Sequence, residues 1–169
     1  MIVAILYGRS WQGVSEATRI LGNAAFASQL QVQDFVDFSD KSLPVLGLVK
    51  MDKQSIESRQ SEPSDFLLLF DTKMDLGILK QAREKSFVIF NSRERISSPL
   101  LKKKKLKAFF VDATGIAVSA TLKPEPHMAM LGAFTKIFGK IQAKNMKAHL
   151  ENPRKVLAFE EGFKGVKRN

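Results

Sequence analysis

Residues 2–25, IVAILYGRSWQGVSEATRILGNAA, decide the fold, because they join a buried strand, a glycine-flanked turn and a helix. Ile2–Tyr7 is an apolar run that ends at Gly8, which is typical of a parallel strand covered on both faces. Beyond Gly13, apolar side chains recur at helical spacing at Val14, Ala17, Leu21, Ala24 and Ala25. Most of them are small, so we expect the helix Glu16–Ala27 to lie close to a sheet.

The rest of the chain repeats this alternation. Extended segments are predicted at Gln31–Phe38, Leu43–Met51, Phe66–Phe70, Phe87–Phe90 and Ala108–Val111, with hairpin and loop at 52–64. Helices are predicted at Met74–Glu84, Ile116–Thr121 and Met128–Phe138, and a last one starts at Asn152–Pro153. This alternation predicts one three-layer α/β/α domain over residues 1–169 with a mainly parallel sheet. Antiparallel pairing of segments 31–38 and 43–51 would make the sheet mixed.

Two further features each allow two structural interpretations. Gly47 inside an extended segment indicates either a bulge or a close backbone approach. Met128–Phe138 is apolar around most of its circumference, which suits either a core helix or a partly exposed docking helix. In the docking version, Phe134 lies in the core and Met130 or Phe138 lies nearer a partner.

Composition excludes several kinds of site. The sequence has no Cys, so it cannot form disulfides, thiolate zinc sites or the Cys ligation of iron–sulfur clusters. His127 and His149 are the only histidines, and their spacing does not suit metal binding. Met1 leads directly into a strand-like run, so we expect no signal peptide. The longest fully apolar run, Phe66–Phe70, is too short to span a bilayer. We therefore expect a soluble, cytoplasmic protein without a membrane partner.

The chain is basic, with 27 Lys and Arg against 17 Asp and Glu, a net charge of +10. Such an excess suits nucleic acid, acidic proteins or an anionic substrate. Part of it lies in Lys102–Lys105, which we interpret as a solvated loop between elements. Aromatic residues do not alternate with these lysines, as a base-stacking surface would require, so nucleic acid is not the expected partner.

The turn after the first strand, from Gly8 to Gly13, is the candidate binding site. A phosphate loop would have Lys and then Ser or Thr after the second glycine, whereas Val14 and Ser15 follow here. A helix N-terminus beside an arginine still suits a phosphate or carboxylate. The alternative is that the glycines only permit a tight turn and that Arg9 meets a local carboxylate. No catalytic constellation is evident in the sequence.

Three segments carry a resemblance to a known family. Gly8-Arg9-Ser10-Trp11-Gln12-Gly13-Val14 is similar to Gly-Arg-Gly-Gly-Gln-Gly-Val, with Ser10-Trp11 in place of two glycines. Phe110-Val111-Asp112-Ala113-Thr114 resembles a Val-Asp-Ala-Thr strand and turn, and Met130-Leu131-Gly132-Ala133 resembles a Met-Leu-Gly-Ala helix. Together, in this order, they resemble the gamma subunit of the 2-oxoacid:ferredoxin oxidoreductases.

The resemblance implies a function for the assembled enzyme. Such enzymes convert a 2-oxoacid and coenzyme A into acyl-CoA and carbon dioxide, using thiamine diphosphate and iron–sulfur clusters, and pass electrons to ferredoxin. The cofactors belong mainly to alpha, beta and delta-type partner chains, so this chain alone is expected to hold none. The gamma chain is associated with coenzyme A near the active site, and the resemblance implies that Gly8, Arg9, Gln12 and Gly13 lie at a turn that faces this cofactor. A non-catalytic interaction module on the same fold is the alternative, and a basic nucleic-acid binder is a third reading.

Overall fold

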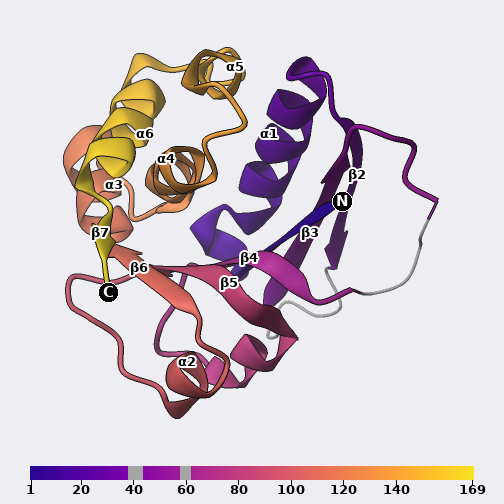
Figure 1. The fold of residues 1–169 in the computed structure, drawn as a ribbon. Helices are drawn as coiled ribbons and strands as arrows, with labels where there is room; N and C mark the ends of the chain where they lie inside the picture. The colour runs from indigo at the N-terminus through magenta and orange to yellow at the C-terminus, as the bar shows by residue number, and fades with distance from the viewer. Residues whose placement is uncertain (38–43, 58–61) are drawn as a thin grey trace.

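The computed structural model describes residues 1–37, 44–57 and 62–169 and contains a seven-stranded sheet of order β2-β3-β1-β4-β5-β6-β7 (Figure 1). The strands are β1 (Ile2–Gly8), β2 (Gln31–Asp37), β3 (Val45–Asp52), β4 (Ser64–Leu69), β5 (Ala82–Asn91), β6 (Lys107–Val111) and β7 (Lys167–Arg168). β1, β4, β5 and β6 run parallel, whereas β3 and β2 at one end and β7 at the other pair antiparallel. The predicted α/β class is confirmed, and the sheet is mixed.

Helical elements cover both faces of the sheet, which gives the predicted three layers (Figure 1). They are η1 (Ser10–Gln12), α1 (Val14–Ala27), η2 (Leu76–Gln81), α2 (Pro99–Lys103), α3 (Ala113–Thr121), α4 (His127–Phe138), α5 (Ala143–Lys147) and α6 (Pro153–Gly165). The larger apolar core joins one face to α1 and α3–α6, and a smaller core joins the other face to η2 and α2. The second helical layer is therefore thin.

Gly47 of β3 marks a close approach, which decides between its two interpretations. The register of β3 with β1 and β2 is unbroken through Gly47, so the strand has no bulge there. A Cβ atom at this position would collide with the side chain of Thr18 on α1, which is fully buried. The small residues of α1 and the missing side chain of Gly47 thus let the helix lie directly on the sheet, as predicted from the sequence.

The predicted helix Met74–Glu84 is wrong. The structure has a 3₁₀ helix, η2, and then β5 starts at Ala82. The inward residues of the prediction, Leu76, Leu79 and Ala82, are spaced by exact threes, which is the repeat of a 3₁₀ helix rather than of an α-helix. Leu79 and Ala82 are fully buried in the smaller core, so the apolar pattern was real but the period was misassigned.

The interpretation of Lys102–Lys105 as a solvated loop is also wrong in part. Ser98 caps the short helix α2, its side chain accepting from the backbone N–H two residues on, and the first lysines form the last turn of that helix. Cations are favourable at a helix C-terminus. The ammonium of Lys104 donates to backbone carbonyls of η2 and of Ala82, so it fastens α2 to the sheet.

The helices α4 and α6 follow the sequence prediction closely, whereas α5 was not predicted. Asn152 caps α6 by accepting from the N–H of Arg154, at 2.8 Å, as the Asn-Pro pair predicts. In α4, Met130 is fully buried and Phe138 is 9% exposed, so the docking interpretation of this helix is wrong and α4 is a core helix. Predicted segment ends at residues 38 and 43 lie outside the described residues, as does part of the 52–64 loop.

α4 and α6 cross at two glycines. A Cβ on Gly132 would overlap the carbonyl oxygen of Phe159 and lie 2.8 Å from the backbone nitrogen of Phe163. A Cβ on Gly162 would lie 2.5 Å from the Cα of Ala129. The two backbones therefore touch without intervening side chains, and this is the structural role of the glycine in the Met-Leu-Gly-Ala segment.

Candidate functional site

The parallel strands β1, β4, β5 and β6 end at one edge of the sheet, where their following residues line a cavity of about 650 Å³. Ligands of open α/β sheets bind outside the carboxyl ends of the strands. The cavity is lined by three cations, Arg9, Lys73 and Arg93, together with Asp71, Asp112, Trp11 and uncharged polar residues. This edge is the candidate functional site.

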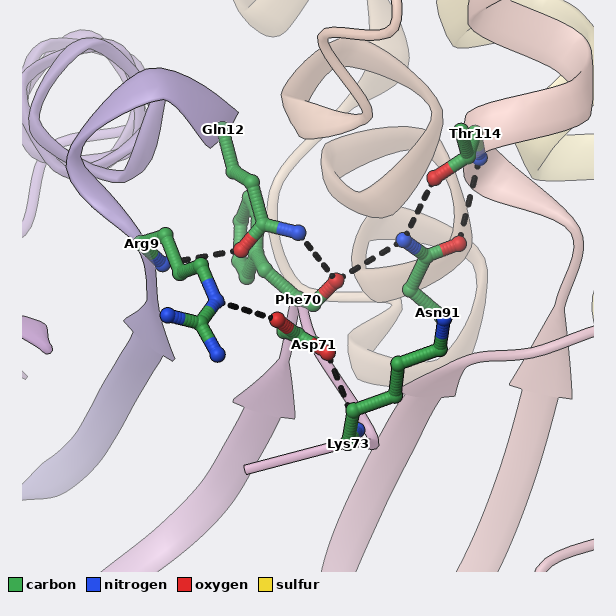
Figure 2. A network of polar contacts seen from close by, with 7 residues as sticks. All are labelled: Arg9, Gln12, Phe70, Asp71, Lys73, Asn91 and Thr114. Carbon is green, nitrogen blue, oxygen red and sulfur yellow. Dashed lines mark hydrogen bonds and ion pairs between the residues drawn. The ribbon is translucent and has the colours of Figure 1, made fainter. Parts of the chain in front are cut away.

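A chain of amide hydrogen bonds holds the edge together (Figure 2). The carbonyl of Phe70 accepts from Gln12 Nε2 at 3.0 Å and from Asn91 Nδ2 at 2.8 Å. Asn91 Nδ2 also donates to Thr114 Oγ1 at 2.8 Å, and Asn91 Oδ1 accepts from the Thr114 N–H at 3.1 Å. One network thus joins the ends of β1, β4 and β5 to the start of α3.

Gln12 belongs to this network and also lines the cavity. It is 4% exposed, and both ends of its amide are used, since Oε1 accepts from the Arg9 N–H at 2.8 Å. The sequence predicts that Gln12 faces a cofactor. In the structure Gln12 lines the cavity but is nearly fully buried, and its amide oxygen holds the backbone N–H of Arg9. Asn91 and Thr114 were not singled out from the sequence as site residues, although each follows a predicted strand and Thr114 lies in the resemblance motif.

The two glycines of the turn have steric reasons. A Cβ on Gly8 would lie 2.6 Å from the Cβ of Phe70. Gly13 has φ +78, and a Cβ there would lie 2.5 Å from the Cγ of His127. Both glycines are therefore required by the tight packing of the turn, independently of any ligand.

Arg9 is paired with a local carboxylate, as the second sequence interpretation expected. Its Nε donates to Asp71 Oδ2 at 2.7 Å, while the side chain stays 49% exposed at the cavity (Figure 2). Arg93 makes a similar pair with Asp112 at 3.1 Å and is more exposed still. Both guanidiniums therefore have donors directed to solvent that can meet an anion.

The start of α1 contributes less to this cavity than the sequence suggested. The 3₁₀ turn η1 lies between β1 and α1, and the cavity is lined by Trp11 and Gln12 of η1 rather than by the first turn of α1. That first turn carries Glu16, which satisfies the positive end of the helix dipole internally. Attraction for an anion at the cavity thus depends on side-chain cations.

Glu16 connects α1 to α4 and α6. Its Oε2 lies 3.1 Å from His127 Nε2 and its Oε1 accepts from Lys155 Nζ at 2.6 Å. His127 is 2% exposed, and its Nε2 faces the carboxylate of Glu16. The His127 contact lowers the pKa of Glu16 from its usual 4.5 to about 2, against the effect of burial and with a smaller contribution from Lys155.

Replacing Glu16 with glutamine should therefore make stability less sensitive to acid. Because the folded-state pKa is depressed, the ionised carboxylate stabilises the fold above pH 4.5, and this contribution disappears as the pH falls toward 2. We expect a loss of about 1 kcal/mol at pH 7, reduced because the side chain is 45% exposed. Urea unfolding of both proteins at pH 7 and pH 3 measures this; an equal difference at the two pH values contradicts it.

Within residues 1–37, 44–57 and 62–169, no group of His, Asp or Glu side chains is arranged to hold a metal ion. No helix in these ranges has the length and apolar character needed to cross a bilayer. The fold and the edge define a class of protein: an α/β/α chain with a cavity at the carboxyl ends of its parallel strands, lined by Arg9, Lys73 and Arg93.

Comparison with known proteins gives the family. The chain belongs to the pyruvate ferredoxin/flavodoxin oxidoreductase family, whose model matches residues 3–164. It is 30% identical to the pyruvate/ketoisovalerate oxidoreductases common subunit gamma of Thermococcus kodakarensis, over 98% of this chain and 89% of that one. Pyruvate synthase subunit PorC of Methanocaldococcus jannaschii is 27% identical over 87% of this chain and 83% of its own length.

Solved structures agree on the fold. Pyruvate oxidoreductase subunit PORC of Thermotoga maritima matches with a TM-score of 0.84 and 22% identity, over 99% of this chain and 98% of that one. The 2-oxoglutarate:ferredoxin oxidoreductase of Magnetococcus marinus, solved with 2-oxoglutarate, coenzyme A and succinyl-CoA bound, matches with a TM-score of 0.84 and 14% identity. The match covers 96% of this chain and 30% of that one, so the same fold forms one part of a longer chain there.

Proposed function

We propose that this chain is the gamma subunit of a 2-oxoacid:ferredoxin oxidoreductase and that its carboxyl edge receives the phosphates of coenzyme A. The observation that carries the subunit role is the family match, which spans nearly the whole chain and nearly the whole length of gamma relatives. The reaction is the thiamine-dependent oxidative decarboxylation of a 2-oxoacid to acyl-CoA. This chain assists it by binding and orientation.

The redox and thiamine chemistry belongs to partner chains of the alpha, beta and delta types. An iron–sulfur cluster does not fit this chain, because the sequence has no Cys and no other ligand group gathers among the described residues. This chain therefore supplies no iron–sulfur cluster to the transfer of electrons to ferredoxin. Its contribution is to complete the assembly and to hold the acyl acceptor.

The cavity residues fit a phosphorylated acceptor. Arg9 and Arg93 each hold one aspartate and keep donors open to the cavity, and Lys73 adds a third cation. Guanidinium groups recognise phosphate through paired N–H donors. In this proposal Arg9 binds the ligand directly, whereas Gly8, Gly13 and the buried Gln12 set the shape of the turn that carries it.

The assembly is tested by native purification. A tagged copy of the chain, expressed in its source organism and isolated under anaerobic conditions, should bring down larger chains that contain thiamine diphosphate and iron–sulfur clusters. Mass spectrometry and the visible absorption of the clusters identify them. Recovery of the chain alone, or with nucleic acid only, would contradict the subunit role.

Arg9→Ala should weaken coenzyme A binding about tenfold, because it removes one charge-assisted contact. Asp71→Asn is the opposing variant: it removes the carboxylate charge paired with Arg9 while keeping the acceptor for the Lys73 N–H, so binding should tighten about threefold. Isothermal titration calorimetry on the purified assembly measures both. Equal affinities in all three proteins would rule out Arg9 as a ligand-binding residue.

A further inference from the structure

Trp11 is an exposed aromatic residue at the edge of the cavity. It lies in η1 between Arg9 and Gln12, it is 55% exposed, and it is one of the residues that line the cavity. It is also the only Trp in the sequence. Phe26, Phe35 and Leu122 are more exposed still, so exposure alone does not distinguish Trp11. Its position does, because an indole next to Arg9 and Arg93 has the chemistry of a binding surface.

The backbone that carries Trp11 is held firmly. Gln12, the next residue, is buried and hydrogen-bonded at both ends of its amide, and Gly13 rests against the His127 ring. On the other side, Arg9 donates its backbone N–H to the same glutamine and its side chain to Asp71. The indole therefore extends from a fixed turn, and a ligand that uses it meets a surface with little ordering left to do.

The surroundings of Trp11 specify the chemistry of that ligand. Arg9, Lys73 and Arg93 line the same cavity and call for a phosphate group. The indole face calls for a flat ring, since stacking on an aromatic side chain contributes on the same scale as a good hydrogen bond. A bare phosphate or an aliphatic phosphate uses only the cations, whereas a nucleotide uses both.

We propose that Trp11 is a specificity-determining residue that stacks on the nucleobase of a phosphorylated ligand at the carboxyl edge. The inference rests on the proposed function and deepens it, because it names the part of the ligand that this chain selects. Trp11 takes the place of a glycine in the motif that this turn resembles. It therefore adds an aromatic ring next to the anion site that the arginines form.

The single Trp makes the test direct. Adenosine diphosphate and pyrophosphate carry the same diphosphate group with and without a planar ring, and coenzyme A serves as the full-length probe. In the purified full chain, adenosine diphosphate and coenzyme A should quench Trp11 fluorescence saturably, and pyrophosphate should leave it nearly unchanged. A ring stacked on the indole quenches its emission, and an anion held by the arginines does not.

Calorimetry with two variants completes the test. Trp11→Ala should weaken adenosine diphosphate and coenzyme A binding roughly tenfold and leave pyrophosphate binding unchanged. Trp11→Phe, which keeps a flat ring, should retain affinity within about threefold. Circular dichroism checks that both variants keep their fold, as expected for an exposed side chain.

Two failures can be told apart. If adenosine diphosphate binds wild type and Trp11→Ala equally, with a dependence on Arg9, the anion site stands and the stacking proposal is overturned. If no phosphorylated probe binds wild type, both the stacking proposal and the coenzyme A site fail. The family membership and subunit role are unaffected by either result, because copurification measures them separately.

Discussion

Replacing Gly132 with alanine should lower the free energy of unfolding by about 3 kcal/mol or more. The added methyl group meets backbone atoms of α6, the carbonyl oxygen of Phe159 and the nitrogen of Phe163, and backbone cannot rotate aside as a side chain can. α4 and α6 would have to separate, which opens the core that α4 shares with the sheet. Urea denaturation followed by circular dichroism measures the loss.

A matched control lies in the same helix pair. Gly165 ends α6 without a positive φ, and the nearest atom to a Cβ there is Ile116 Cδ1 at 3.7 Å, an ordinary contact. Gly165→Ala should be neutral or slightly stabilising, because alanine restricts the unfolded chain more than glycine does. Gly162→Ala should be as harmful as Gly132→Ala. If Gly132→Ala behaved like Gly165→Ala, the close crossing would be wrong.

Gly13→Ala should cost about 3 kcal/mol of stability, from two separate causes. The left-handed backbone at φ +78 is unfavourable for alanine by about 1 kcal/mol. The methyl group would also strike the ring of His127, whose side chain is buried and cannot leave without opening the junction of α1 and α4. Thermal and urea unfolding measure the total.

Gly139→Ala separates the two causes. Gly139 also has a left-handed backbone, with φ +67, but a Cβ there has no atom within 4 Å among the described residues. This variant should show the backbone cost alone, about 1 kcal/mol. The excess loss in Gly13→Ala should then fall when His127 is also replaced by alanine. Equal losses at the two glycines would show that the His127 ring does not restrict the turn.

The sequence predicts the layers of this fold well, because apolar period and glycine position are local properties. Val3–Leu6 and Met128–Phe134 are buried as expected. The predicted α-helix at Leu76 and Leu79 is wrong, because their spacing of three residues belongs to a 3₁₀ helix. The predicted solvated loop is wrong at Lys104, because folding brings two backbone carbonyls close to its ammonium group. Periodicity cannot show which distant group a long polar side chain reaches.

The site was predictable in position and less so in detail. Gly8 and Gly13 mark the turn in the sequence, and Arg9 is the cation beside it. The partner of Arg9 is Asp71, 62 residues away, and the network through Asn91 depends on strand order. Whether Gln12 faces a ligand or the protein interior is likewise a property of packing. Each of these contacts joins residues that are far apart in the sequence, so a local sequence pattern identifies at most one of the two partners.

The two hydrogen bonds to the carbonyl of Phe70 limit how the carboxyl edge can move. Gln12 and Asn91 both donate to this one oxygen, so a single carbonyl connects the ends of β1, β4 and β5 (Figure 2). Asn91 also donates to Thr114, which connects the start of α3 to the same network. A displacement at any one strand end would break hydrogen bonds at the others, so the carboxyl edge moves as one unit. The backbone amides at the ends of β1, β4 and β5 should therefore exchange with solvent together rather than one strand at a time.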